Sequence, residues 1–401
     1  MISERELFGR HIAQTSPFPI SLEIKNASGC YLFSESGKKY IDLISGISVS
    51  NLGHCHPKIV GAVHDQVEKY MHLMVYGEYV QSPQVKLAGL LTSLLPESLD
   101  NVYFVNSGSE AIEGAMKLAK RHTGRKRILS FNNSYHGSTQ GSLSLMGDNK
   151  LKNTFYPLLP DIAQLNFNKV EDLKLITSDV AAVFVEPIQG EAGVILPQGD
   201  FLLRLRKRCD ETKTLLVFDE IQTGYGRTGK LFAFEHFGII PDILCLAKAM
   251  GGGMPLGAFI SSRKIMSELA GNPELGHITT FGGHPVCCAA GYAALQVLLD
   301  EKIMDSVKWK HDLFLSNLKH KHIREVRGQG LLLAIEFDNF ELNKKLIGEC
   351  LKSGLIVDWF LFNMKSMRIA PPLIIEAEEI VSSCRILIDC LNKIEYECSH
   401  H

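Results

Sequence analysis

Residues 242–255 read DILCLAKAMGGGMP, a pattern from which the rest of the chain can be ordered. The apolar run 243–247 is short enough for one buried strand, and it is followed by a single lysine, Lys248. Three glycines and a proline come next, which predicts a turn with few side chains over that lysine. Partial desolvation at a strand end lowers the pKa of a lysine and makes its amine a nucleophile. The alternative is a lysine that reaches water from the strand end.

A second stretch, LLVFDEIQTGYGRTG at residues 215–229, begins with another short apolar strand. Asp219 and Glu220 stand at its end, and in an open α/β sheet the carboxyl ends of the strands border the ligand crevice. A lysine and a carboxylate on neighbouring strand ends are what pyridoxal phosphate requires. The lysine forms a Schiff base, and the aspartate keeps the pyridine nitrogen protonated so that the ring accepts electrons.

Further strands and helices alternate along the chain. The pattern predicts strands at 101–105, 127–131 and 180–185, with a helix at 201–212 before the Asp219 strand. Alternating strands and helices indicate parallel pairing with right-handed crossovers. After residue 300 the pattern changes to a smaller α+β unit, in which we expect 327–338 to hold a strand that follows a glycine turn.

Two further segments have both a structural and a functional interpretation. Ser107 or Ser109 can cap the helix that follows the 101–105 strand, and the free N–H groups at such a terminus favour phosphate; an ordinary helix cap is the alternative. Tyr135 can stack on a flat cofactor ring, or it can be a loop aromatic that covers the core.

Two patterns that suggest other chemistry are set aside. The segment 224–230, GYGRTGK, matches G-x-G-x-x-G, but it does not leave its strand directly, and two carboxylates precede it. We therefore expect no nucleotide site there. His54, Cys55 and His56 are too close in sequence to ligate one ion together, so no metal site is expected.

The composition excludes several classes of protein. The 401 residues are 45% hydrophobic and 21% charged with a net charge of −2, so neither nucleic acid nor an anionic membrane is an expected partner. Ten cysteines without paired short spacing indicate reduced thiols and a cytoplasmic location. No apolar run approaches the roughly 18 residues of a membrane span, and residues 1–11 do not read as a targeting signal.

With these residues in view, the chain resembles the class III pyridoxal-phosphate-dependent aminotransferases, which include the acetylornithine, ornithine and 4-aminobutyrate enzymes. The matching segments occur in the family's order over nearly the whole chain, and together they are highly specific. They are GHCHP from Gly53, NSGSEA from Asn106, YHGST from Tyr135, EPIQGEAGV from Glu186, FDEIQTGYGRTG from Phe218, LAKAMGGGMPLGA from Leu246, TTFGGHP from Thr279 and RIAPPL from Arg368.

The resemblance implies an α/β protein of the type I pyridoxal-phosphate-dependent transferase fold. A large domain at 51–299 would hold a mostly parallel seven-stranded sheet, and residues 1–50 and 300–401 would form a small α+β domain. It also implies a homodimer with shared active sites.

The resemblance further implies roles for individual residues. Lys248 would form the Schiff base and move protons, and Asp219 would pair with the pyridinium nitrogen. Arg368 would bind the substrate α-carboxylate, and Glu191 would pair with that arginine; the alternative for Arg368 is a surface ion pair. The remaining cofactor-binding residues would be Ser107, Gly108, Ser109, Tyr135, His136, Glu186, Gln222 and Thr280, the last one serving the partner subunit's phosphate, while Ser138 and Thr279 would contact the substrate.

The implied activity is transfer of a terminal amino group to 2-oxoglutarate, from a donor like ornithine, N-acetylornithine or 4-aminobutyrate. The chain departs from this family pattern at Ser138, where those branches usually carry an arginine that holds the distal carboxylate of the substrate. Either another basic residue covers that carboxylate, or the donor lacks one. An aminomutase or racemase of the same fold, and a non-catalytic binding protein, remain as alternatives.

Overall fold

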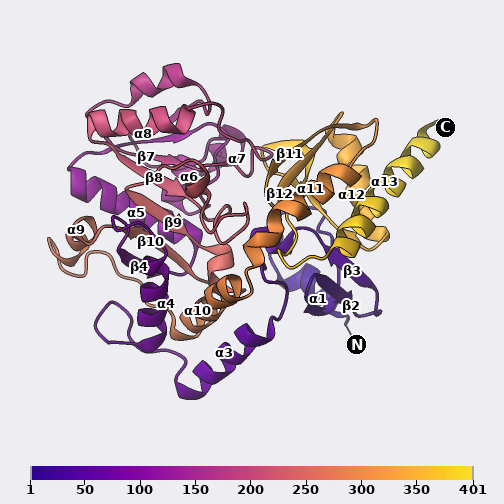
Figure 1. Cartoon of the computed structure of the whole chain (residues 1–401), viewed down its shortest axis with the longest axis horizontal. Helices are drawn as coiled ribbons and strands as arrows, with labels where there is room; N and C mark the ends of the chain where they lie inside the picture. Colours follow the sequence, from indigo (N-terminus) through magenta and orange to yellow (C-terminus); the bar gives the residue numbers. More distant parts are fainter. Residues whose placement is uncertain (1, 400–401) are drawn as a thin grey trace.

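The computed structural model describes residues 2–399, and a seven-stranded sheet forms the centre of its larger part (Figure 1). The strand order is β4-β10-β9-β8-β7-β5-β6, and β10 alone runs antiparallel to its neighbours. The expected mostly parallel sheet is thereby confirmed. Its strands are β4 (Asn101–Val105), β5 (Arg127–Phe131), β6 (Ile162–Leu165), β7 (Val180–Val185), β8 (Leu215–Asp219), β9 (Ile243–Leu246) and β10 (Gly257–Ser261).

Helices cover both faces of this sheet, which explains why its central strands carry apolar residues throughout. Every residue of β7, β8 and β9 is buried. Helix α5 (Gly108–Thr123) packs so closely that a Cβ on Gly114 would lie 2.2 Å from the Phe259 ring. Helices α8 (Phe201–Thr212) and α10 (Pro285–Asp300) also belong to this larger part. Its other helical elements are α3 (Pro57–Lys69), α4 (Ser82–Ser93), α6 (Gln140–Leu145), α7 (Asn149–Lys152), α9 (Arg263–Met266), η1 (Asn153–Phe155), η2 (Val170–Leu175), η3 (Ala233–His236), η4 (Lys248–Gly251) and η5 (Ser267–Ala270).

The N-terminal and C-terminal regions of the chain both belong to the second part of the molecule (Figure 1). Residues 355–356 of the C-terminal region form a strand that pairs in parallel with β3, so the N-terminal strands share a sheet with a segment more than 300 residues away. A second sheet has the order β11-β12-β15-β14. The elements are α1 (Glu4–His11), β1 (Ile24–Ser28), β2 (Tyr31–Ser34), β3 (Lys39–Asp42), α2 (Ser45–Ser48), η6 (Ile303–Ser306), α11 (Val307–Asn317), β11 (Ile323–Gln329), β12 (Leu332–Phe337), α12 (Phe340–Lys352), β13 (Leu355–Ile356), β14 (Asp358–Phe360), β15 (Asn363–Ile369) and α13 (Ala377–Ser399).

The strand expected to follow a glycine turn within 327–338 is confirmed as β12. The residues before the turn form β11, which was not predicted; the two strands pair antiparallel and turn at Gly330. Gly330 has φ +57°, and a Cβ there would lie 2.6 Å from the carbonyl oxygen of Arg227. The turn therefore needs a glycine because the hairpin packs against a loop of the larger part.

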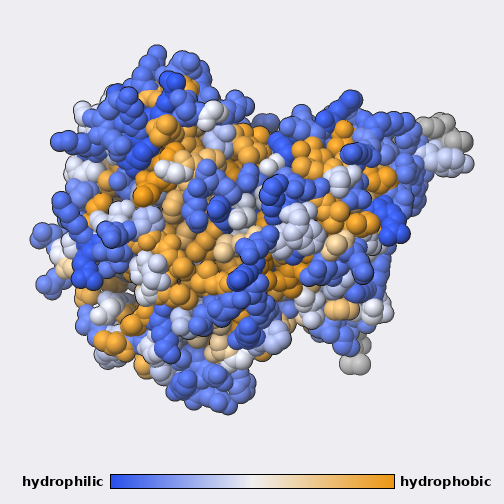
Figure 2. Space-filling model, viewed as in Figure 1, coloured by the Kyte–Doolittle hydropathy of each residue, from blue (hydrophilic) through white to orange (hydrophobic). Residues whose placement is uncertain are grey.

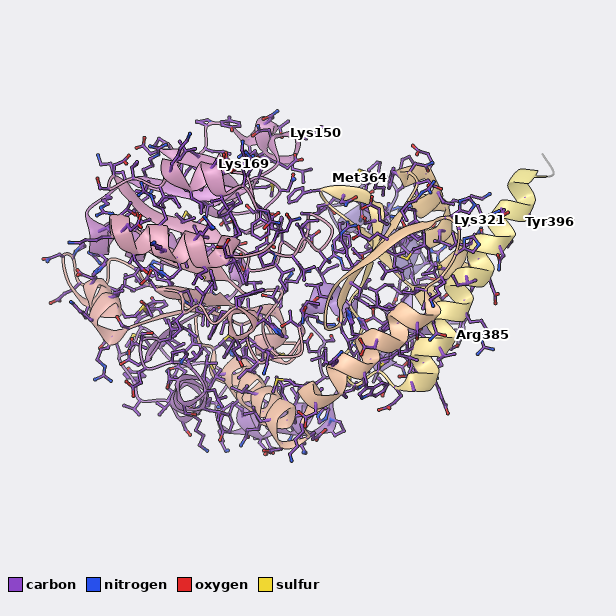
Figure 3. All side chains as sticks on the ribbon, turned by 45° about the horizontal axis from the view of Figure 1, so that its top comes forward. Lys150, Lys169, Lys321, Met364, Arg385 and Tyr396 are labelled. Carbon is purple, nitrogen blue, oxygen red and sulfur yellow. The ribbon has the colours of Figure 1, made fainter. Side chains whose placement is uncertain are left out.

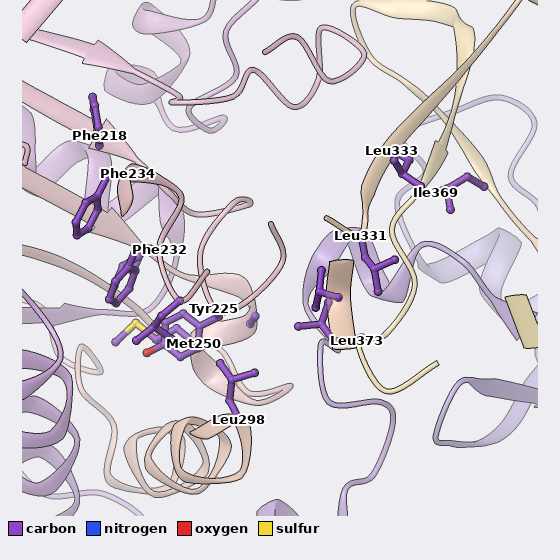
Figure 4. Packing of buried hydrophobic residues seen from close by; sticks show 14 of the residues in the cluster. Phe218, Tyr225, Phe232, Phe234, Met250, Leu298, Leu331, Leu333, Ile369 and Leu373 are labelled. Carbon is purple, nitrogen blue, oxygen red and sulfur yellow. The ribbon is translucent and has the colours of Figure 1, made fainter. Parts of the chain in front are cut away.

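A hydrophobic cluster joins the two parts. Figure 4 shows Tyr225, Met250 and Leu298 on the side of the seven-stranded sheet, with Leu331 and Leu373 across from them; all five are buried. Figure 3 labels Met364, at the start of β15, on the side of the smaller part turned toward the large sheet. The proposed division of the chain after residues 50 and 299 stays a prediction.

Candidate active site

A cavity of about 430 Å³ lies at the carboxyl ends of the central strands. It brings together residues from six separate segments of the sequence, as expected for a ligand crevice of an open α/β sheet. The sequence-predicted residues that line it are Ser107, Gly108, Ser109, Tyr135, His136, Glu186, Glu191, Asp219, Gln222 and Lys248. The cavity lining does not include Ser138, Thr279, Thr280 or Arg368.

Lys248 begins the 3₁₀ turn η4 directly after β9 and Ala247. Its backbone φ of 50° lies in the left-handed region, which is strained for a lysine and is typical of functional positions. Burial lowers the pKa of its amine, and the carboxylate of Glu191 opposes this shift. Lys248 therefore carries its amine into the cavity with a reduced tendency to hold a proton.

Asp219 ends β8 and is held by two hydrogen bonds. Its Oδ2 lies 2.7 Å from His136 Nδ1, and its Oδ1 accepts a hydrogen bond from the Ile221 backbone N–H at 3.0 Å. The carboxylate is almost fully buried and is therefore fixed in orientation. The resemblance implies that His136 binds the cofactor, and in the structure the His136 ring lines the cavity and is paired with Asp219.

Glu186 follows β7 and lies near both Asp219 and His136. Its carboxylate accepts hydrogen bonds from the backbone N–H groups of Tyr135 and Gly190, each at 2.9 Å. Burial raises the pKa of Glu186 to about 7, helped by Asp219 and opposed by His136. This carboxyl fixes the loop that carries Tyr135 relative to the loop that carries Glu191.

The N-terminus of α5 forms one wall of the cavity. Ser107 is the N-cap, and its Oγ accepts a hydrogen bond from the Glu110 N–H at 3.2 Å. Gly108 opens the helix, and a Cβ at this position would lie 2.7 Å from Ile221 Cδ1. The absence of a side chain leaves the first backbone N–H groups accessible, which is the arrangement that favours phosphate.

Arg368 lies next to this cavity and contacts it through Glu191. Arg368 NH2 is 2.8 Å from Glu191 Oε2, and both side chains are buried. The Leu361 N–H also donates to Glu191 Oε2 at 3.1 Å, so the β14–β15 turn holds this glutamate from the smaller part. The expected pair of Arg368 and Glu191 is present, and Arg368 is not part of a surface ion pair.

Two residues, one beside Arg368 and one beside Tyr135, were not predicted from the sequence. Asp358 on β14 places its Oδ1 3.4 Å from Arg368 Nε, and Phe362 lies 6.5 Å from the Tyr135 ring, centroid to centroid. The proximity of Asp358 to Arg368 follows only from the pairing of β14 with β15, in which the two residues stand opposite each other.

Ser138 lies at the exposed side of Tyr135. The two hydroxyl oxygens, Ser138 Oγ and Tyr135 Oη, are 3.1 Å apart. This end of the site therefore carries neutral hydroxyls at the position where, by the resemblance, an arginine is expected. Thr279 and Thr280 lie outside the cavity. Thr279 Oγ1 accepts a hydrogen bond from Asn106 Nδ2 at 3.1 Å, and Thr280 is exposed.

The residues present fit pyridoxal phosphate. Within residues 2–399, several buried polar atoms of the site have no hydrogen-bond partner, namely His136 Nε2, Gln222 Nε2 and Arg368 NH1. A buried amine, a buried carboxylate and a helix N-terminus thus surround one cavity and match the aldehyde, the ring nitrogen and the phosphate of that cofactor.

Among the described residues we find neither a metal-binding cluster nor a membrane-spanning helix. Across 2–399, no group of three His, Cys, Asp or Glu residues is arranged to hold a metal ion. Over the same range, no helix has the length and apolar character needed to cross a membrane.

Comparison with known proteins agrees with this geometry. The family model described as aminotransferase class-III matches residues 12–391. An acetylornithine aminotransferase of Methanopyrus kandleri is 39% identical, with coverage of 96% of this chain and 98% of the relative. An acetylornithine aminotransferase of Methanocaldococcus jannaschii is 40% identical, with coverage of 92% of each chain. Among solved structures, the ornithine aminotransferase of Toxoplasma gondii superimposes with a TM-score of 0.91 at 29% identity, over 99% of this chain and 97% of that one.

Proposed function

The chain belongs to the class-III aminotransferase family, and from this premise we propose that it transfers a terminal amino group to 2-oxoglutarate, with pyridoxal phosphate as cofactor. The observation that carries the proposal is the buried amine of Lys248, which shares one cavity with Asp219 and Glu191. A binding protein of the same fold has no need for a buried amine of lowered pKa in that place.

When bound, pyridoxal phosphate supplies an aldehyde that takes up amino groups and a ring that accepts electrons. Lys248 Nζ would be the amine that holds it, because its lowered pKa leaves the nitrogen lone pair available. The same Nζ would act as general base and acid toward the substrate carbon that carries the amino group. Ser107, Gly108 and Ser109 would hold the phosphate at the start of α5.

Asp219 would hold the proton on the ring nitrogen. Its Oδ2 contacts His136 Nδ1 and its Oδ1 accepts the Ile221 N–H, so the carboxylate is oriented before the cofactor arrives. A preoriented charge in a dry site acts more strongly than the same charge in water. Gln222 and Tyr135 line the same cavity and would contact the ring.

The Glu191–Arg368 pair would let one site accept two kinds of substrate. With Glu191 in place, Arg368 is masked, which suits an amine donor without a carboxylate at the reacting carbon. When Glu191 is displaced, the guanidinium is free to bind the α-carboxylate of glutamate or 2-oxoglutarate. The 2.8 Å contact between the two side chains supports this arrangement.

Ser138 bears on the choice of donor. A neutral hydroxyl contributes about 1 kcal/mol where a charged partner contributes about 1.5–3 kcal/mol. We therefore expect only modest kcat/KM for N-acetylornithine and 4-aminobutyrate, and higher values for terminal amines without a distal carboxylate.

We further propose a homodimer in which Thr280 reaches the cofactor phosphate of the partner subunit, because Thr280 does not line the cavity of its own subunit. Large apolar side chains at the surface support an interface, among them Phe18 at 83% and Val80 at 94% exposure. Figure 2 shows hydrophobic residues reaching the surface across the middle of one face.

A cytoplasmic location is proposed from the nine described cysteines, all of which are free thiols.

A donor panel tests the proposed function. Conversion of 2-oxoglutarate to glutamate should be measured with ornithine, N-acetylornithine, 4-aminobutyrate and 1,5-diaminopentane, for the parent and for Ser138→Arg. We expect transfer from terminal amines in the parent and, in the variant, a gain for the three donors with a distal carboxylate, ornithine, N-acetylornithine and 4-aminobutyrate. Isomerisation of an amino acid without any 2-oxo acid would instead identify a mutase or racemase. A parent kcat/KM above about 10⁴ M⁻¹s⁻¹ for N-acetylornithine would show that another residue holds the distal carboxylate.

A further inference from the structure

Arg368 is in contact with two carboxylates rather than one. Glu191 lies 2.8 Å from its NH2 group, and Asp358 Oδ1 lies 3.4 Å from its Nε. Within residues 2–399, Arg368 Nε and NH1 and Asp358 Oδ1 are all buried without a hydrogen-bond partner, so Asp358 contacts the guanidinium as an ion pair and not through a hydrogen bond. One buried guanidinium and two carboxylates give this cluster a net charge of −1 when all three are ionised.

The two carboxylates are attached to the molecule in different ways. Glu191 belongs to the loop after β7, in the larger part, and is held by the Leu361 N–H. Asp358 stands directly opposite Arg368 in the antiparallel pair β14–β15, so both sit on one hairpin. The Phe360 ring, on the same hairpin, lies 4.6 Å from Arg368 Cζ and covers one face of the guanidinium. Displacement of Glu191 by a substrate carboxylate therefore leaves Asp358 in place.

We propose that Asp358 is a specificity-determining residue that weakens the binding of any carboxylate at Arg368, and so favours donors whose reacting carbon carries none. The inference rests on the proposed function, because it concerns the site at which that reaction would take place. A carboxylate that replaces Glu191 enters a position already next to a fixed negative charge, and like charges in a poorly solvated site repel strongly. A terminal amine brings no such charge and is not penalised.

The surroundings of Asp358 show over which pH range this repulsion acts. Burial, together with the nearby carboxylates of Glu191 and Asp42, raises the pKa of Asp358 to about 6. Arg368 and Lys248 act in the opposite direction. Asp358 is therefore ionised at pH 8 and largely protonated at pH 5, so its repulsion of a carboxylate is present at the higher pH and relieved at the lower one.

Calorimetric binding of glutarate, a dicarboxylate that cannot react, to the cofactor-free and the cofactor-loaded protein tests the charge directly. Asp358→Asn keeps the shape of the side chain and removes its charge. We expect glutarate to bind the variant about tenfold tighter than the parent at pH 8, the size typical of one nearby like charge. At pH 5 the two proteins should differ by less than about threefold, because the parent has lost the same charge.

Asp338→Asn is the matched control, since Asp338 lies outside the cavity and pairs with Arg324. Its glutarate affinity should equal that of the parent. Asp358→Ser serves as a second variant if the asparagine variant does not fold, and it should shift the affinity in the same direction. Equal or weaker glutarate binding in the folded Asp358 variants at pH 8 would overturn the inference.

Half-reactions supply the specificity readout. The ratio of kcat/KM for glutamate to kcat/KM for 1,5-diaminopentane should rise about tenfold in Asp358→Asn, and an unchanged ratio contradicts the inference. If the parent reacts with neither donor, the proposed function fails. The glutarate measurement still decides the role of Asp358 in that case, because it needs no turnover.

Discussion

Replacing Glu191 by glutamine should shift the enzyme toward glutamate as amino donor. The glutamine keeps the shape of the side chain but removes the negative charge that lies 2.8 Å from Arg368 NH2. Both side chains are nearly fully buried, with 7% and 2% exposure, so solvent screens this pair little. A hydrogen bond to a charged group contributes about 1.5–3 kcal/mol, and replacing the carboxylate by a neutral amide moves this contact from the upper to the lower end of that range, a difference of about 1.5 kcal/mol.

That difference corresponds to a factor of about ten. In the parent, glutamate must displace Glu191 before its α-carboxylate reaches Arg368, whereas a terminal amine reacts with the pair intact. The kcat/KM of the glutamate half-reaction should therefore rise about tenfold in Glu191→Gln, and that of 1,5-diaminopentane should stay within about twofold.

Stopped-flow absorbance of the cofactor measures each half-reaction separately. Asp338→Asn provides the control for a carboxylate removed outside the cavity. If the ratio of the two kcat/KM values does not change in Glu191→Gln, or falls, then Glu191 does not mask Arg368 and the two-substrate argument is wrong.

Two further predictions concern the cofactor site and the dimer. Asp219→Asn should slow the half-reaction of every donor by at least about a hundredfold, because an amide does not stabilise a charged ring nitrogen in a dry site, while the melting temperature changes little; single-turnover rates within about threefold of the parent would reject this role. Mixing inactive Lys248→Ala with a strongly disabled variant, Thr280→Glu, should restore part of the activity through hybrid dimers, and full activity in a monomer verified by light scattering would contradict the shared site.

The elements that could be predicted from the sequence are those in which local pattern and tertiary environment agree. The strands at 101–105, 127–131 and 180–185 and the helix at 201–212 have the predicted bounds. Each is an apolar run or an amphipathic segment between turn residues, so its boundaries are set locally. Lys248 and Asp219 followed from the same pattern, because each comes directly after or at the end of such a strand.

The features that were missed depend on contacts between distant residues. Strand β11, which precedes the glycine turn, was not predicted, because it is defined by its pairing with β12 and by the contact of Gly330 with Arg227, about a hundred residues earlier in the chain. The contact of His136 with Asp219 and that of Asp358 with Arg368 likewise arise from tertiary structure and from strand register. The sequence shows such side chains but not their partners.

The central claim is that Lys248 is the amine that holds pyridoxal phosphate. Borohydride reduction of the cofactor-loaded protein, followed by proteolysis and mass spectrometry, locates the lysine to which the cofactor becomes irreversibly attached. We predict that a single peptide containing Lys248 carries the added mass, and that Lys248→Ala remains folded but unlabelled. A label on any other lysine, or equal labelling of the Lys248→Ala protein, would contradict the assignment.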